Sequence, residues 1–163
     1  MFVDLATLTF VHTALSFLAL FTGVLIVPGL LGRRIPAFPT PLFLLLAVAT
    51  SATGFAFPFN GVLPSHVVGG IALVVLAVAL FAHYYAHLSG SWRWIYAVSA
   101  IASVYFLVFV GLAQAFAKIP ALKAAAPTQS EPPFLIAQLV VLAVFIGLGI
   151  AATRVKGDGI KEI

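Results

Sequence analysis

Four histidines are the side chains of this chain best suited to chemistry. The sequence has no cysteine, and its four acidic residues lie outside the long apolar stretches. His83 and His87 are four residues apart, so a regular helix places both on one face, where they suit a metal ion. The neighbouring apolar stretches contain no acidic residue to act as a third ligand. The alternative interpretation is a pair of polar side chains at the level of the lipid headgroups.

His12 and His66 are the candidates for a haem b or other metal centre. Axial ligation of haem takes two histidines at one depth on facing helices, or one histidine with a different second ligand. His66 and His87 are 21 residues apart, which is about 31 Å along a helix, so they do not share a haem. His12 and His66 fall in the same half of a membrane, at depths that differ by several residues. A membrane redox protein that binds haem or a metal through these two histidines is one hypothesis.

Known enzyme signatures are absent from the sequence. There is no G-x-S-x-G elbow, no phosphate-binding glycine loop and no acidic pair within an apolar stretch. A proton or cation pump usually carries a carboxylate inside the membrane, and none is found there. The sequence does not decide whether the protein is an enzyme, although the absence of these signatures argues against it.

The elements that position these residues follow from the composition. Of 163 residues, 63% are hydrophobic and only 7% are charged, and the mean hydropathy is +1.21. So little charge does not cover a water-soluble domain, and lipid must be the solvent for most of the surface. Continuous apolar runs without alternation predict helices rather than barrel strands. We expect a single all-α polytopic membrane bundle over residues 1–163.

Five transmembrane helices are predicted, at about 5–31, 41–59, 63–88, 92–118 and 133–153. The second is the least certain to span, because it is short and its second half reads Thr50-Ser51-Ala52-Thr53-Gly54. If it only dips into the membrane, the bundle has four spans.

The distribution of Lys and Arg predicts the orientation of a five-span bundle. With the first loop, the third loop and the C-terminal tail inside, six basic residues lie inside and two outside, as the positive-inside rule favours. The N-terminus is then outside and the C-terminus inside. Five aromatic residues fall at the inner interface in this arrangement: Tyr84, Tyr85, Trp92, Trp94 and Tyr96.

The same orientation gathers polar residues in the outer half of the bundle. Together they predict a binding pocket open to the outside, formed by His12, Thr13, Ser16, Thr50, Thr53, His66, Gln114, Glu131 and Gln138. The competing interpretation applies above all to hydroxylated and small residues, which let membrane helices approach closely and hydrogen-bond to one another. Ala19 and Gly23 continue the stripe of His12 and Ser16 at helical spacing and suggest such a packing face.

Three kinds of function remain in view. The first is a non-enzymatic binding or accessory protein that uses the outer pocket. The second is the haem or metal protein described above, and the third is a small channel or transporter subunit. The expected partners are the lipid bilayer and either another membrane protein or a second copy of the chain. Nucleic acid is not expected, because the eight Lys and Arg form no basic run.

Four short stretches carry a resemblance to a protein family. They are Thr53-Gly-Phe-Ala-Phe-Pro-Phe59, Pro64-Ser-His66, Trp92-Arg-Trp-Ile-Tyr96 and Ala126-Pro-Thr-Gln-Ser-Glu-Pro-Pro-Phe134. The chain resembles a family of small bacterial inner-membrane proteins without assigned function. The resemblance implies a multi-pass protein of the bacterial inner membrane and brings no reaction, cofactor or ligand.

Overall fold

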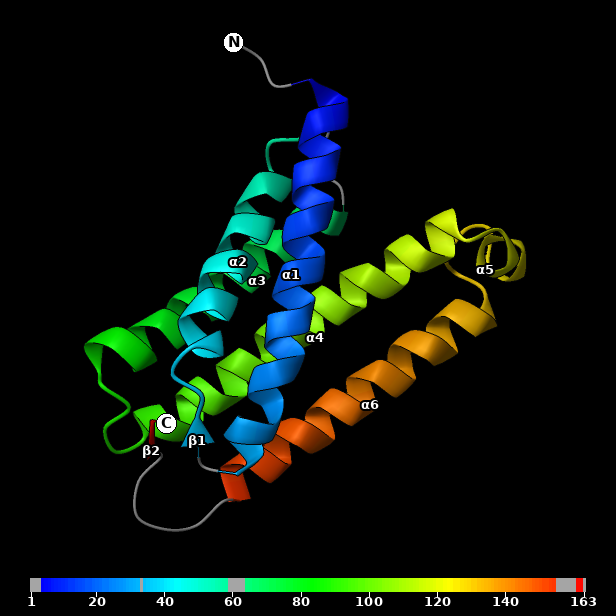
Figure 1. Ribbon diagram of the computed structural model, residues 1–163. Coiled ribbons are helices and arrows are strands. Elements are labelled where there is room, and N and C mark those ends of the chain that lie inside the picture. The colour runs from blue at the N-terminus through cyan, green and yellow to red at the C-terminus, as the bar shows by residue number, and fades with distance from the viewer. Residues whose placement is uncertain (1–3, 33, 59–63, 155–160, 163) are drawn as a thin grey trace.

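The computed structural model describes residues 4–32, 34–58, 64–154 and 161–162, and these residues are almost entirely helical (Figure 1). The elements in chain order are α1 (Leu5–Leu31), β1 (Arg34–Ile35), α2 (Pro39–Gly54), α3 (Pro64–Leu80) with the π-helical turn η1 (Phe81–Tyr85), α4 (Trp92–Lys118), α5 (Pro120–Ala125), α6 (Pro132–Arg154) and β2 (Lys161–Glu162). The predicted all-helical class is confirmed. Arg33 and Lys156, two of the six basic residues that the predicted topology places inside, lie outside the described residues.

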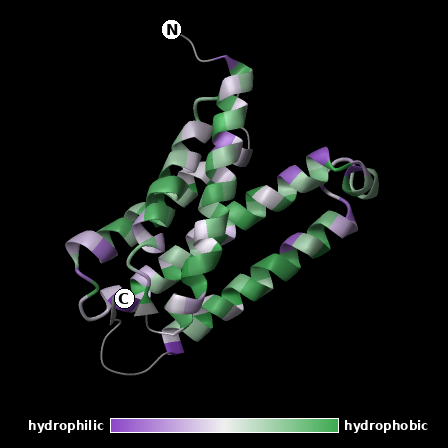
Figure 2. Cartoon of the chain, in the orientation of Figure 1, coloured by the Kyte–Doolittle hydropathy of each residue, from purple (hydrophilic) through white to green (hydrophobic). Residues whose placement is uncertain are grey.

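Four helices in the described part of the chain are long and apolar enough to cross a membrane. They are α1, Ser65–Tyr85, α4 and α6, whereas α2 is apolar but has only 16 residues. Figure 2 shows hydrophobic residues along these helices and hydrophilic residues mostly near their ends. Large apolar side chains are widely exposed, Phe10 to 75% and Leu139 to 62%. Such a surface is stable in lipid, where it needs no polar cover, and four apolar helices of this length are consistent with a membrane protein.

Two of the five predicted spans have the bounds of helices in the structure, the fifth is one residue shorter than α6 at each end, and two differ for local reasons. α1 and α4 have the predicted bounds. α2 begins two residues early, because prolines at positions 39 and 41 suit a first helical turn. It ends at Gly54 instead of continuing to position 59, and residues 55–58 form turns that lead to a proline.

The predicted third span, 63–88, continues too far. Regular α-helix stops at Leu80, and the chain then takes one π-helical turn. His87 and Leu88 follow with φ of 47° and 54°, a left-handed conformation that non-glycine residues adopt rarely and that ends the helix.

The core lies where α1, α2, α3 and α4 meet. Side chains there are at most 2% exposed and include Ile26, Phe43, Leu76 and Tyr96. Gly23 allows the close approach of α1, because a Cβ at this position would lie 3.0 Å from side-chain atoms of both Phe43 and Val104. The prediction that this stripe is a packing face therefore fits its environment.

The two ends of the bundle differ in structure. At one end, β1 pairs in parallel with β2, with Arg34 opposite Lys161, so the α1–α2 connection and the C-terminal segment are held together. At the other end, the hairpin of α4 and α6 is directed away from the N-terminal part of α1, and α5 lies at its tip (Figure 1).

The predicted aromatic belt is wrong at one position. Tyr84, Tyr85 and Trp94 are each at least half exposed, as interfacial residues should be. Tyr96 is fully buried and packs against the ring of His83 with 5.3 Å between centroids. It is a core residue, because α4 turns this position toward α3.

Candidate functional site

His12 and Thr53 form the clearest polar contact between two helices. The Nδ1 atom of His12 on α1 lies 2.9 Å from the Oγ1 atom of Thr53 near the end of α2. Thr53 faces α1 because α2 packs beside it, and the helix ends one residue later at Gly54. A Cβ at Gly54 would lie 3.6 Å from the Cε1 atom of His12, an ordinary van der Waals distance, so the imidazole lies directly beside the end of α2.

The hydrogen bonds of Thr53 determine which nitrogen of His12 carries the proton. The Thr53 hydroxyl lies 2.8 Å from the carbonyl oxygen of Ala49 and 3.1 Å from that of Thr50. Both carbonyls only accept, so the single hydroxyl proton is directed to them. With the hydroxyl proton so directed, the Thr53 oxygen accepts from His12, and this arrangement favours the tautomer with a proton on Nδ1. In the neutral imidazole the Nε2 atom consequently keeps its lone pair.

A neutral imidazole held in this way has a limited chemistry. Its Nε2 atom accepts a hydrogen bond or ligates a metal, and in ligating histidines the other nitrogen is characteristically held by a hydrogen bond. No group of three or more His, Asp or Glu that would form a metal site occurs within the described ranges. The arrangement offers one oriented acceptor, without the carboxylate of a catalytic triad.

His12 and His66 each have an aromatic ring as a neighbour. His12 meets Phe57 edge-on at 5.3 Å, and His66, in the first turn of α3, lies 5.7 Å from Phe55. Both histidines therefore contact the short segment Thr53–Phe57. The ammonium group of Lys118, the last residue of α4, is also within electrostatic range of the His12 ring.

Three further predicted pocket residues lie on α1 and α2. Ser16 is half-buried and donates to the carbonyl of His12 at 2.7 Å. Thr13 is half-buried on the same helix. Thr50 is 7% exposed, and its Oγ1 atom has no hydrogen-bond partner among the described residues. These residues lie within about a turn of His12 or Thr53 along their own helices.

The remaining predicted pocket residues lie on the α4–α6 hairpin. Gln138 of α6 is 8% exposed and donates from Nε2 to the carbonyl of Phe109 on α4 at 3.2 Å, while its Oε1 atom is buried without a partner in the described chain. Gln114 is exposed on α4. The structure thus divides the predicted set between a His12 group on α1–α3 and a second group on the hairpin.

Glu131 closes a local turn before α6. Its carboxylate accepts hydrogen bonds from the backbone amides of Thr128 and Ser130 and from the Thr128 hydroxyl. Partial desolvation acts to raise the pKa of Glu131, but these hydrogen bonds outweigh it and lower the pKa below the ordinary value of 4.5. The carboxylate is engaged in shaping its own loop.

His83 and His87 do not have the regular helical geometry that a shared metal face assumes. His83 belongs to the π-helical turn, half-buried with its ring 4.6 Å from that of Tyr84 and 5.3 Å from that of Tyr96. His87 is exposed beyond the turn, in a left-handed conformation.

Comparisons with protein families, with curated proteins and with solved structures find no match to this chain. What the protein does therefore has to follow from its own residues.

Sequence patterns overlooked two features of these regions. Gln129 donates to the carbonyl of Ala113 at 2.9 Å, one helical turn beyond the contact of Gln138 with Phe109, so two glutamines bind α4 side by side. The aromatic contacts of Phe55 and Phe57 were hidden because both looked like ordinary span residues. The Pro58 that follows them was the available sign that the helix had already ended.

Proposed function

We propose that this chain is a five-span protein of the bacterial inner membrane, with its N-terminus outside and its C-terminus inside. We further propose that it has a non-enzymatic binding or accessory role. Its outer half binds a small ligand or a partner segment, with the Nε2 atom of His12 as the oriented acceptor.

Two observations support five spans rather than four. His12 lies 19 residues from Leu31, about 28 Å along α1, and Thr53 hydrogen-bonds to it. α2 therefore reaches almost as far from the inner end as a bilayer core of about 30 Å requires. The pairing of β1 with β2 also supports five spans, because it places the first loop and the C-terminal tail on one side of the membrane. An even number of helices must then cross between them: α2, α3, α4 and α6 are four, whereas only three cross if α2 does not.

The anchored imidazole is the observation that carries the binding role. A histidine in hydrocarbon is costly unless it is paired, yet here only one of its two nitrogens is used by Thr53. The hydrogen bond orients the ring and fixes the tautomer, which is the preparation that a ligand donor needs at Nε2.

The same observation favours a second candidate, a haem b or metal site that uses His12 and His66. A hydrogen bond from Nδ1 to a protein oxygen is the usual support of a ligating histidine. Both rings contact the segment Thr53–Phe57, so one bound group can reach both.

Purified protein in mild detergent separates these candidates. A native mass spectrum should show a bound small molecule that is lost in His12→Leu and retained in His87→Leu, a control at an exposed histidine. A Soret band lost in the same variant would assign haem, and metal analysis would assign an ion. Identical ligand-free spectra for wild-type protein and His12→Leu would refute the binding role.

Single cysteines test the topology without background, since the chain has none. Ser130→Cys and Ser89→Cys are exposed positions at opposite ends of the bundle. An impermeant maleimide should label Ser130→Cys in intact cells and Ser89→Cys only after lysis. Labelling of both from outside would show that α4 does not cross. Asp4→Cys, also at an exposed position, should label from outside together with Ser130→Cys if α2 crosses, and the two should label from opposite sides if it does not.

A further inference from the structure

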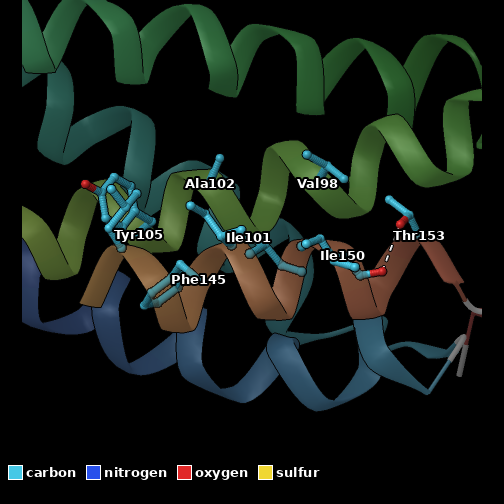
Figure 3. Close-up of a pocket in the computed structure, with 10 residues that line it drawn as sticks. Val98, Ile101, Ala102, Tyr105, Phe145, Ile150 and Thr153 are labelled. Atoms are coloured by element: carbon cyan, nitrogen blue, oxygen red, sulfur yellow. Dashed lines mark hydrogen bonds between the residues drawn. The ribbon is translucent and has the colours of Figure 1, made fainter. Parts of the chain in front are cut away.

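An apolar groove runs between α4 and α6 (Figure 3). It has a volume of about 370 Å³ and is lined by α4 residues from Val98 to Tyr105 and α6 residues from Leu142 to Thr153. This volume lies within the range of about 300–1,000 Å³ that is typical of small-molecule sites. Apart from the Tyr105 and Thr153 hydroxyls, the lining side chains are hydrocarbon, so the occupant must be apolar over this length.

The length of the groove matches one leaflet. Leu142 and Thr153 are 11 residues apart, which is about 16 Å along α6. Half of a bilayer core is about 15 Å. A partner helix that crossed the membrane would need a groove about twice as long, whereas a lipid acyl chain of one leaflet needs this length.

The two ends of the groove differ in chemistry. At the end of the groove away from Thr153, the ring of Tyr105 packs on Phe145 with 5.7 Å between centroids. Figure 3 shows Tyr105 and Thr153 at opposite ends of the lining residues. At the Thr153 end, Ile150 also lines a second, open hollow that it shares with Gly147, Ala151 and Arg154. The apolar groove thus opens beside an exposed cation.

An aromatic residue flanks the same opening. Trp94 is 51% exposed and lies four residues before Val98, on the same face of α4. Tryptophan beside arginine at the end of an apolar helix is the arrangement found at lipid headgroups. The site therefore combines a hydrocarbon channel one leaflet deep with a positive charge at headgroup level.

We propose that this groove binds one anionic phospholipid of the leaflet in which Arg154 lies. One acyl chain occupies the channel between α4 and α6, and the phosphate contacts the Arg154 guanidinium. The inference is independent of the ligand proposed at His12, because the two sites share no residue.

Native mass spectrometry of the full chain in detergent tests the proposal with two lipids of identical acyl chains. Phosphatidylglycerol should remain bound, and phosphatidylcholine should bind at least fivefold less, the factor that one interfacial cation provides. Arg154→Gln should lower retention of phosphatidylglycerol about fivefold. Lys123→Gln, at an exposed cation on α5, is the matched control and should leave retention unchanged.

A second pair of variants tests the hydrocarbon part. A Cβ at Gly149 or at Gly111 meets nothing within 4 Å, but only Gly149 lines the groove. Gly149→Leu should therefore abolish retention of phosphatidylglycerol, whereas Gly111→Leu should not. Circular dichroism verifies the fold, and Arg154→Gln keeps the test valid if Gly149→Leu misfolds.

Three outcomes would overturn the proposal. Equal retention of both lipids would mean unselective annular binding. Undiminished retention in Arg154→Gln would show that no headgroup is held there. A dimer that dissociates on Gly149→Leu would show that a second copy of the chain covers the groove.

Discussion

The hydrogen bond between His12 and Thr53 is the most direct target for a quantitative test. We consider the variants His12→Leu, Thr53→Val and their combination. Valine keeps the β-branched shape of threonine, and the carbonyls of Ala49 and Thr50 keep their own helical hydrogen bonds. The interaction lost in the cycle is thus mainly the contact of 2.9 Å between Nδ1 and Oγ1.

The expected coupling follows from related measurements. Hydrogen bonds between side chains of membrane helices average about 0.6 kcal/mol and reach about 1.7 kcal/mol. The short distance and the oriented hydroxyl place this contact in the upper half, so we expect about 1 kcal/mol. The assay is unfolding in mixed micelles with increasing dodecyl sulfate, followed by far-ultraviolet circular dichroism. The control cycle pairs Thr53→Val with His87→Leu and should be additive.

The tautomer provides an independent measurement. Nitrogen-15 spectra of labelled protein should show a protonated Nδ1 and an unprotonated Nε2 for His12, and Thr53→Val should remove the preference. A coupling below about 0.3 kcal/mol, the additivity error of unrelated sites, would refute the reasoning. So would a proton on Nε2, because the oriented acceptor at the centre of the proposed function would then be absent.

Three further predictions concern packing and the outer loop. Gly23→Ala should destabilise by about 1–3 kcal/mol through overpacking, whereas Gly111→Ala, whose Cβ meets open space, should be neutral or stabilising in the same unfolding assay. Because the pKa of Glu131 is lowered, its stabilisation of the loop is complete above about pH 4.5 and declines as pH falls through the lowered pKa. The protection factor of the Thr128 amide against hydrogen exchange, corrected for the intrinsic rate, should fall over that range, and Glu131→Gln should remove this dependence. Gln138→Leu should change the free energy of unfolding by less than about 1 kcal/mol, because it removes one hydrogen bond but also a buried unpaired oxygen. A loss of several kcal/mol would mean that the Oε1 atom of Gln138 accepts a hydrogen bond from a further donor.

The sequence predicted the helices well because length and hydropathy determine them. The bounds of α1 and α4 and the packing of Gly23 needed only apolar runs and helical spacing. The hydroxyl groups were less predictable. Ser99 and Ser103 of α4 are hydroxylated residues of the kind that can bond between helices, yet each donates to a carbonyl four residues earlier in its own helix. That choice depends on the side-chain rotamer, which spacing does not encode.

The sequence also did not predict that the polar pocket residues divide into one group on α1–α3 and another on the α4–α6 hairpin. His12 and Gln138 share a depth in a schematic topology, but depth says nothing about which helix neighbours which. Ile101 and Val104, near the middle of α4, are buried in the core, and beyond them the α4–α6 hairpin is directed away from the N-terminal part of α1 (Figure 1). The π-helical turn at Phe81 likewise leaves no mark in hydropathy. Contacts between helices therefore had to come from the three-dimensional structure.

The shortness of α2 connects the fold to the proposed site. Its 16 residues extend about 24 Å, so they fall about 6 Å short of a bilayer core of about 30 Å. A short helix is accommodated by local thinning of the membrane and by polar residues at its end. Thr53 lies at that end and bonds to His12, so in the proposed topology the imidazole would lie below the outer surface of the bilayer, beside the non-helical segment 55–58. A span of full length would place His12 against hydrocarbon throughout, with its second nitrogen out of reach of any ligand from outside.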